Sequence, residues 1–321
     1  MKNKRNRYLN LNLFFTVLCP CSMEKILFAL CEGPHDVAFL YRILQVNGLQ
    51  KYSKPIGEFP APLNKYFASE AAGENLEQLK LEEVRNRRLP SEVLAHKDDA
   101  LVLLYAIGGD SQVEPRQKLL QDVARIYGRH QPEEKKIKTG ATAQCSVLYF
   151  FDADQKGSDA RLQEVCRELS KVLESEVSLS GNPQQYRHTN GITYAAHIFA
   201  EAGKPTGKLE NILLPLMRQG DEEIFHRAES YVELHDPKRL PRLKVVEMGN
   251  GQLTEVRDEK KKGKYHRDKS VIGIAAQLQN SGSTNTVCIK HSDYLTRNKI
   301  VSDPSCRKIW HTFEALIVPT P

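Results

Sequence analysis

The sequence lacks the patterns by which many proteins bind zinc or cross membranes. Its seven cysteines include no Cys-x-x-Cys pair and its ten histidines no His-Glu-x-x-His motif, so a structural zinc site is not expected. No apolar run approaches the ~18–20 residues that a membrane-spanning helix needs. An odd number of cysteines without metal-ligand spacing indicates reduced thiols. We therefore predict a cytoplasmic protein that does not contact a membrane.

The sequence also has little excess charge. It contains 46 lysines and arginines against 40 aspartates and glutamates, a formal charge of +6. Four of the basic residues, Lys2, Lys4, Arg5 and Arg7, lie at the very start, and the remaining chain is close to neutral. Bulk charge therefore does not indicate a nucleic-acid-binding protein, and such binding would need a local basic patch.

The first 22 residues have two interpretations. A basic start followed by a short apolar stretch is the outline of a secretory signal peptide. Alternatively, residues 1–22 are a dispensable extension and Met23 is the natural start. We favour the second interpretation, because Met23 directly precedes a predicted strand and the region around Pro20 has no clean small-x-small cleavage pattern.

The rest of the chain alternates between apolar runs and amphipathic segments. Its 321 residues suffice for one large domain or two ordinary ones, and 40% apolar with 27% charged residues is typical of a globular protein. Strands are predicted at residues 26–31, 100–107, 146–151 and 193–199, and helices at 37–46, 117–127, 160–174 and 209–217. This alternation predicts a doubly wound, mainly parallel α/β sheet with right-handed crossovers.

The predicted α/β domain covers residues 23–217, and two segments depart from its pattern. Residues 50–95 form an insertion that contains a charged helix at 74–88. Residues 218–321 form a mainly helical C-terminal extension, with a polar, mostly basic loop at 255–269 and helices at 271–279 and 304–317.

Acidic residues follow three of the predicted strands. Glu32 follows the first strand, Asp110 follows the second after two glycines, and Asp152 and Asp154 close the third. Ligands bind at the carboxyl ends of strands in open parallel sheets. Two acids two positions apart leave an extended strand from the same face. We therefore expect these carboxylates to meet at one edge of the sheet.

Converging carboxylates repel one another and raise one another's pKa unless a cation compensates. Mg²⁺ is the ion that such oxygen ligands suit, and it often shares its remaining positions with substrate phosphates. A bound ion of this kind polarises a phosphoryl oxygen and lowers the pKa of water. The acids therefore favour metal-assisted phosphoryl transfer or phosphodiester cleavage.

Two segments resemble a known family. Ile26-Leu-Phe-Ala-Leu-Cys-Glu32-Gly33-Pro-His-Asp36 and Val147-Leu-Tyr-Phe-Phe-Asp152-Ala-Asp154 resemble the two signature motifs of the Toprim domain. Topoisomerases, bacterial primases, recombination-mediator proteins and overcoming-lysogenisation-defect (OLD) nucleases share this domain. Gly108-Gly109-Asp110 and Thr206-Gly-Lys-Leu-Glu210 are similar to small stand-alone Toprim proteins related to those nucleases. The resemblance covers residues 24–217 and implies a Rossmann-like fold.

The resemblance also implies roles for individual acids. Glu32 would be a metal ligand or general acid/base, and Asp152 with Asp154 would hold Mg²⁺, with Mn²⁺ as a substitute. Glu210 would help to bind a second ion, and Asp110 is a further candidate ligand. The sequence shows no ATPase module of the kind that accompanies the nucleases, so a separate ATPase is a candidate partner.

Each candidate also has a purely structural interpretation. Asp36, just beyond Glu32, can cap the following helix. Asp110 can be a turn residue, and Glu210 can be a first-turn acid stabilised by the helix dipole. Glu32 and the Asp152 pair can belong to solvated turns.

The densest basic segment gives the candidate nucleic-acid contact. If this segment lies beside the acidic site, it would neutralise phosphates and bind DNA or RNA in a salt-dependent way. If it lies away from the site, it is a solvated loop. Its basic residues are Lys260, Lys261, Lys262, Lys264 and Arg267.

The sequence thus predicts a Mg²⁺-dependent Toprim nuclease, or a related phosphotransfer enzyme, that acts on nucleic acid. The alternative is a non-catalytic Toprim-like module that binds nucleic acid or a partner protein. The sequence leaves the oligomeric state open.

Overall fold

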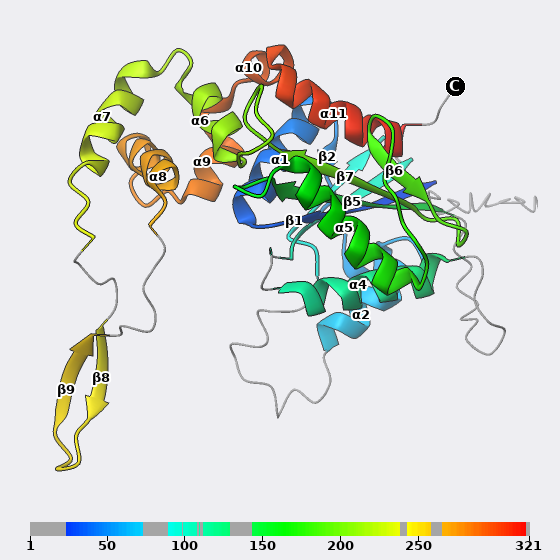
Figure 1. Ribbon diagram of the computed structural model, residues 1–321, viewed down its shortest axis with the longest axis horizontal. Coiled ribbons are helices and arrows are strands. Elements are labelled where there is room, and N and C mark those ends of the chain that lie inside the picture. The colour runs from blue at the N-terminus through cyan, green and yellow to red at the C-terminus, as the bar shows by residue number, and fades with distance from the viewer. Residues whose placement is uncertain are drawn as a thin grey trace, which may run out of the picture.

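A central sheet organises the chain in the computed structural model (Figure 1). The sheet has seven strands in the order β2-β3-β4-β1-β5-β7-β6. The structure describes residues 24–72, 89–97, 99–107, 109, 112–128, 143–237, 243–257 and 265–318.

The four middle strands run parallel, and the outer strands run antiparallel to their neighbours. The parallel strands are β1 (Lys25–Cys31), β4 (Ala100–Ala106), β5 (Gln144–Asp152) and β7 (Thr193–Phe199). Their almost continuous apolar sequences are buried on both faces, as parallel strands require. The outer strands are β2 (Gln50–Lys51), β3 (Glu92–His96) and β6 (Gln184–Arg187).

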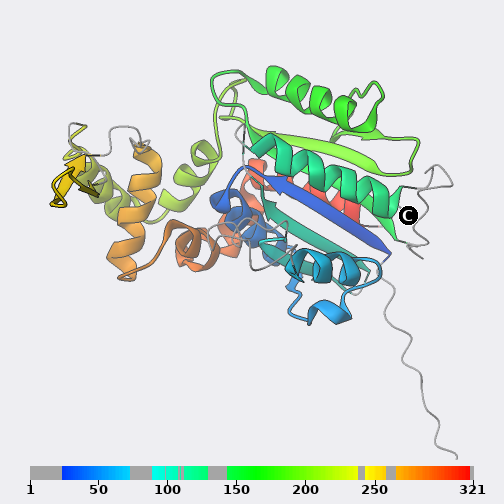
Figure 2. The ribbon, with the colours of Figure 1, turned by 90° about the horizontal axis from the view of Figure 1, so that it is seen from below.

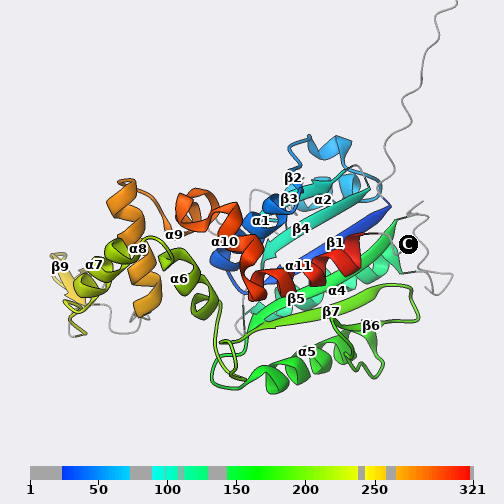
Figure 3. The same cartoon turned by 90° about the horizontal axis from the view of Figure 1, so that it is seen from above.

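Helices cover both faces of the sheet because each buried strand directs alternate side chains to opposite sides. In β1, Leu27 and Ala29 belong to one hydrophobic core and Ile26 and Phe28 to the other. The first core contains α1 (Pro34–Val46) and α11 (Pro304–Ile317), and α11 crosses the sheet in Figure 3. The second core contains α2 (Leu63–Ala72), α4 (Val113–Tyr127) and α5 (Ser158–Leu173), seen from the other side in Figure 2.

The segment after β7 adds helices to the first core. Phe225, Ile272 and Ile289 are buried together with residues of β1 and α1. The extension therefore shares a core with the sheet instead of forming one of its own. Its helices are α6 (Glu210–Arg218), α7 (Glu222–Val232), α8 (Arg267–Gln279), α9 (Asn285–His291) and α10 (Arg297–Ser302), and a 3₁₀ turn at Asp293–Leu295 lies between α9 and α10. Another 3₁₀ turn, at Ile56–Glu58, follows β2.

A hairpin interrupts the helical extension. Strands β8 (Leu243–Glu247) and β9 (Leu253–Arg257) pair only with each other and extend away from the main body in Figure 1. Sequence periodicity did not predict these strands.

The α/β architecture confirms the predicted fold class at the level of a mostly parallel, doubly wound sheet. The predicted strand at 193–199 and helix at 304–317 have the observed bounds. The insertion contributes β2, β3 and α2, whereas the expected helix at 74–88 lies outside the described residues. None of the helices in the described ranges is both long and apolar enough to span a bilayer.

Candidate functional site

Glu32 and Asp152 meet at the carboxyl ends of two neighbouring strands. Glu32 follows β1 directly, and Asp152 is the last residue of β5, which pairs with β1 in parallel. The backbone N–H of Asp152 donates to Glu32 Oε1 over 3.1 Å. The expected convergence of acids far apart in sequence therefore occurs at this pair.

The two acids line a cavity of about 390 Å³. Parallel topology brings the end of β1, the start of α1 and the end of β5 to one edge of the sheet, as in other open α/β sheets. The C-terminal extension forms the opposite wall. The lining residues are Glu32, Gly33, Pro34, His35, Asp36, Asp152, Leu209, Glu210, Lys269 and Thr286.

Asp36 is a buried acid at the start of α1. The helix begins at Pro34, three residues earlier than predicted, so Asp36 lies inside the first turn and is not the N-cap residue. Its Oδ2 accepts a hydrogen bond from the backbone N–H of Gly33 over 2.8 Å. Burial and the nearby Glu32 carboxylate raise the pKa of Asp36 to about 7. Asp36 thus satisfies a backbone N–H at the start of α1 from inside the first turn, and it also lines the cavity.

Asp152 carries the most strongly raised pKa of the cavity acids for which a shift is resolved. Burial, followed by the charges of Asp36 and Glu32, raises its pKa to about 8, although Oδ1 accepts a hydrogen bond from the backbone N–H of Leu209 over 2.8 Å. The single hydrogen bond does not offset burial and like charge. Asp152 therefore holds a proton at neutral pH in the protein alone.

Glu210 is stabilised as an anion. It is the first residue of α6, and its side chain is only 3% exposed. Its Oε1 lies 3.6 Å from His35 Nδ1 and 3.5 Å from Lys269 Nζ. Burial by itself raises the pKa of Glu210, but His35, Lys269 and Lys208 overcome that effect and lower it to about 2. The cavity thus contains a permanent carboxylate beside two carboxyls that titrate near neutral pH.

Asp154 is oriented differently from Asp152. The strand ends at Asp152, and Asp154 adopts a left-handed backbone with φ of 48°, exchanging two backbone hydrogen bonds with Gly207. Its carboxylate lies 2.9 Å from Arg161 Nη2 and is half exposed. Asp154 is not among the residues that line the cavity. The expectation that both aspartates leave one face of an extended strand is therefore wrong.

Arg161 contacts Glu32, Asp152 and Asp154. This buried residue of α5 donates from Nε to the Asp152 carbonyl over 2.9 Å, and its Nη2 lies 3.6 Å from Glu32 Oε1. Its Nη1 also pairs with Glu164 Oε2 over 3.0 Å. The guanidinium supplies fixed positive charge to Glu32 and Asp154.

Sequence reasoning missed two cations of the site, Arg161 and Lys269. Arg161 occupies the buried stripe of α5 together with Val165 and Leu169. A charged residue in an apolar stripe is a signal that the helical periodicity alone could have revealed. Lys269 had no such signal, because only the docking of α8 beside α6 brings it to the cavity.

Of the remaining predicted site residues, only Arg267 is among those that the structure describes. Asp110 lies outside the described residues, as do Lys260, Lys261, Lys262 and Lys264. Arg267 begins α8 and lies 3.2 Å from Glu233, pointing its charge at the surface of α7. It does not line the cavity.

The donor set of the cavity consists of carboxylates, which suit a hard divalent ion such as Mg²⁺. Within the described ranges, no three His, Cys, Asp or Glu side chains converge closely enough to form a ready-made metal centre. Mg²⁺ usually takes one or two protein carboxylates and retains several waters. Burial, and after it the charge of neighbouring carboxylates, raises the pKa values of Asp36 and Asp152. A bound cation would favour the ionised form of both groups, so the carboxylates present fit such a partly hydrated ion.

Comparison with known proteins assigns no family. No family model matches the chain, and no curated protein matches it. Among solved structures, the chain is similar to the crystal structure of a hypothetical protein from Pyrococcus horikoshii OT3, with 15% identity and a TM-score of 0.47. The similarity covers 91% of this chain and 95% of that chain.

Proposed function

We propose that this chain is a Mg²⁺-dependent Toprim-type phosphodiesterase that cleaves DNA or RNA. The hydrogen bond between the Asp152 N–H and Glu32 Oε1 carries the proposal, because it joins the two strand-end acids at one cavity. Glu32 and Asp152 would hold the ion, with Glu210 as the candidate ligand for a second one. A separate ATPase partner belongs to the same proposal.

When bound, Mg²⁺ supplies Lewis-acid polarisation of a phosphoryl oxygen and a water of lowered pKa. Asp36 and Asp152 release protons as the cavity gains positive charge, because their raised pKa values reflect burial and mutual repulsion. Glu32 remains oriented by the Asp152 N–H. Lys269 lines the same cavity, and its ammonium group would pair with a substrate phosphate bound there.

A non-catalytic binding module is the second candidate. The ion pair between Asp154 and Arg161 favours it, because Asp154, which was expected to bind metal, is already neutralised by a permanent cation. Such a domain would bind the phosphates of a nucleic acid through Lys269 without cleaving the phosphodiester bonds.

Cleavage assays distinguish the two candidates. The full chain is incubated with plasmid DNA, single-stranded DNA and RNA in Mg²⁺ or Mn²⁺, beside Asp152→Asn and Glu32→Gln. Asp99→Asn is the matched control, since Asp99 is exposed and lies immediately before β4, at the opposite end of the strands. We expect metal-dependent cleavage that both cavity variants abolish and the control retains. Cleavage that persists in Asp152→Asn contradicts the proposal, and metal-independent binding without cleavage supports the second candidate.

A further inference from the structure

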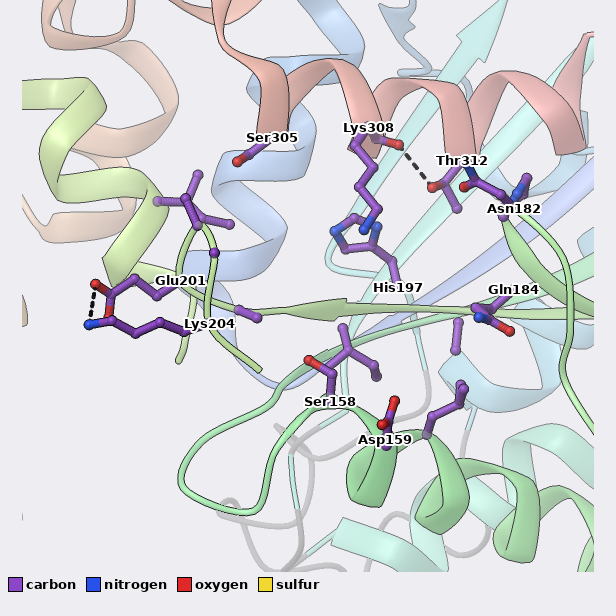
Figure 4. Close-up of a pocket in the computed structure, with 18 of the residues that line it drawn as sticks. Ser158, Asp159, Asn182, Gln184, His197, Glu201, Lys204, Ser305, Lys308 and Thr312 are labelled. Atoms are coloured by element: carbon purple, nitrogen blue, oxygen red, sulfur yellow. Dashed lines mark hydrogen bonds and ion pairs between the residues drawn. The ribbon is translucent and has the colours of Figure 1, made fainter. Parts of the chain in front are cut away.

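A second cavity, of about 520 Å³, lies beside the outer edge of β7 (Figure 4). Residues of α11 form one wall and residues of α5 form the other, with the strand between them. No residue lines both this cavity and the one at the strand ends. The volume is within the range of roughly 300–1,000 Å³ that is typical of ligand pockets.

The edge of β7 is unpaired in this cavity beyond Ala196, because β6 pairs with β7 only from Thr193 to Ala196. The turn before β6, residues 181–183, lines the cavity beside this edge. The Phe199 carbonyl accepts a hydrogen bond from Ala153, the residue after β5, so Phe199 directs its backbone groups toward that side. Because successive residues alternate, Ile198 directs its N–H and C=O outward into the cavity. No hydrogen bond from the described part of the chain reaches those two groups.

The α11 side of the edge contains a buried imidazole and a cation. His197 is 8% exposed, packs against Phe150 and Phe199, and receives no hydrogen bond from any residue in the described ranges. Burial and the charge of Lys308 lower its pKa to about 3, so the ring is neutral. Figure 4 shows Lys308 beside this ring. This compartment therefore offers an ammonium group and an imidazole without a partner.

The α5 side of the edge has a different chemistry. Ala196 and Ile198 point to the second core, where Leu162 also packs. Asp159 lies in the first turn of α5 and lines the same wall. This compartment therefore combines an aliphatic floor with a carboxylate. Lys204, also at the cavity, is already paired with Glu201 over 2.7 Å.

We infer that this open edge binds an extended segment of a partner protein, which adds to β7 as a further strand. Main-chain groups of the segment would pair with Ile198. Successive side chains of a strand point to opposite faces, so an acidic residue would meet Lys308 and His197 while its basic neighbour would meet Asp159 and Leu162. Charge of opposite sign on the two walls favours such an alternating peptide over a ligand of one charge.

A peptide titration tests the inference. The probe is a fluorescein-labelled Thr-Glu-Lys-Val-Thr pentapeptide with blocked ends, followed by fluorescence anisotropy against the full chain. Two matched peptides carry N-methyl groups on alternate backbone amides. One is methylated at the odd-numbered residues and the other at the even-numbered residues. We expect the unmethylated probe to bind saturably. One of the two N-methylated peptides should bind with an affinity about tenfold lower or weaker still, because a strand directs only alternate amides at its neighbour. Equal affinity of all three peptides, or no saturable binding, overturns the inference.

Protein variants locate the binding. Lys308→Glu is compared with Arg307→Glu, an equal change of charge at the exposed neighbouring residue, which does not line the cavity. We expect Lys308→Glu to weaken binding by about tenfold and to favour a peptide with Lys in place of Glu, whereas Arg307→Glu changes little. Equal effects of both variants contradict the site. Displacement of the probe by free glutamate as effectively as by the unlabelled peptide would indicate a small-molecule site and also contradict it.

The inference is independent of the proposed hydrolase activity. Asp152→Asn removes a carboxylate from the other cavity, so peptide affinity should be unchanged in that variant. Thermal melts of every variant confirm folding before titration. If Lys308→Glu fails to fold, Ile198→Pro gives the second test, because it removes the outward N–H; undiminished peptide binding by folded Ile198→Pro would overturn the inference.

Discussion

The backbone N–H of Asp152 donates to Glu32 Oε1 over 3.1 Å, across 120 positions of sequence. The register of β1 against β5 places Cys31 beside Phe150, so the Glu32 side chain reaches one residue further along its neighbour. A side chain added at Gly109 would approach the other oxygen, Oε2, to 3.4 Å. Glu32 therefore lies between the end of β5 and the segment that follows β4.

The acid cluster makes the stability of the metal-free protein fall as pH rises. Asp36 and Asp152 have pKa values of about 7 and 8 in the folded protein, above their ordinary value of 3.8. From about pH 4 upward the unfolded chain has ionised both groups, while the folded protein retains the proton of Asp36 up to about pH 7 and that of Asp152 up to about pH 8. The free energy of unfolding therefore decreases by up to about 1.4 kcal/mol per pH unit per group. Below about pH 6.5 the buried His197, with its lowered pKa, contributes a change of opposite sign, so urea denaturation from pH 6.5 to 9 measures this decrease.

Asp152→Asn isolates the contribution of one acid from the other groups that titrate. The variant lacks the ionisable carboxyl, so its stability should exceed that of the native protein by a margin that grows from about pH 4 to about pH 8 and levels off above that pH. Mg²⁺ should stabilise the native protein more at pH 9 than at pH 6, and the variant little at either pH. If the difference in free energy of unfolding between the two proteins did not change with pH, the raised pKa of Asp152 would not be the cause.

The fold was largely predictable because its main signals are local. Apolar runs such as 146–151 and the amphipathic segment 304–317 specify a buried strand and a helix without knowledge of the rest of the chain. The hairpin of β8 and β9 was not predictable, because its strands are mostly exposed and carry no clear alternation. Short edge strands such as β2 depend on a neighbour that the local sequence does not specify.

The candidate site was predictable only in part. Glu32 and Asp152 follow strands, so topology alone places them at one edge of the sheet. The departure of Asp154 depends on its left-handed backbone and on Arg161, a contact between a loop and the following helix. Lys269 comes from a helix that only tertiary packing brings to the cavity. Local patterns contain none of this information.

Arg161→Met should be destabilising. The Arg161 side chain is only 4% exposed and contacts the Asp152 carbonyl and the partly exposed carboxylates of Glu32, Asp154 and Glu164. Because water can reach these carboxylates after the substitution, the loss should be about 1–3 kcal/mol, as for hydrogen bonds lost at a buried group. Arg167→Met, on the exposed face of the same helix, should remain within about 0.5 kcal/mol. Urea denaturation of both variants measures the difference, and equal stabilities would show that the network contributes nothing.

Gly207→Ala should destabilise the loop that leads to the site. Gly207 has φ of 133° and exchanges backbone hydrogen bonds with Asp154, and a Cβ there would lie 2.4 Å from the Glu201 nitrogen. Gly203→Ala is the matched control, since its φ is 76° and nothing lies within 4 Å of the added carbon. The control should cost about 1–2 kcal/mol, the usual cost of left-handed backbone, and Gly207→Ala clearly more. Similar losses of stability in the two variants would exclude the close approach as the cause.

Lys269→Ala should weaken nucleic-acid binding through the loss of one phosphate contact. Lys269 is the one lysine or arginine among the described residues that line the acidic cavity, and it lies 3.5 Å from Glu210. Measured by anisotropy on duplex DNA in the Asp152→Asn background, the slope of log K against log salt should fall by about 0.9. Lys171→Ala, in the last turn of α5, is the control and should leave the slope unchanged.

The same substitution gives a second measurement that does not depend on nucleic acid. The charge of Lys269 helps to lower the pKa of Glu210 to about 2, so Lys269→Ala should raise that pKa toward its ordinary value. NMR titration of the Glu210 carboxyl in the metal-free protein detects the change. A raised Glu210 pKa with an unchanged salt slope would mean that Lys269 serves only to neutralise Glu210, and that the substrate phosphates bind elsewhere. A fall in the slope together with a raised pKa would assign both roles to one ammonium group, because each arises from the same charge at the cavity wall.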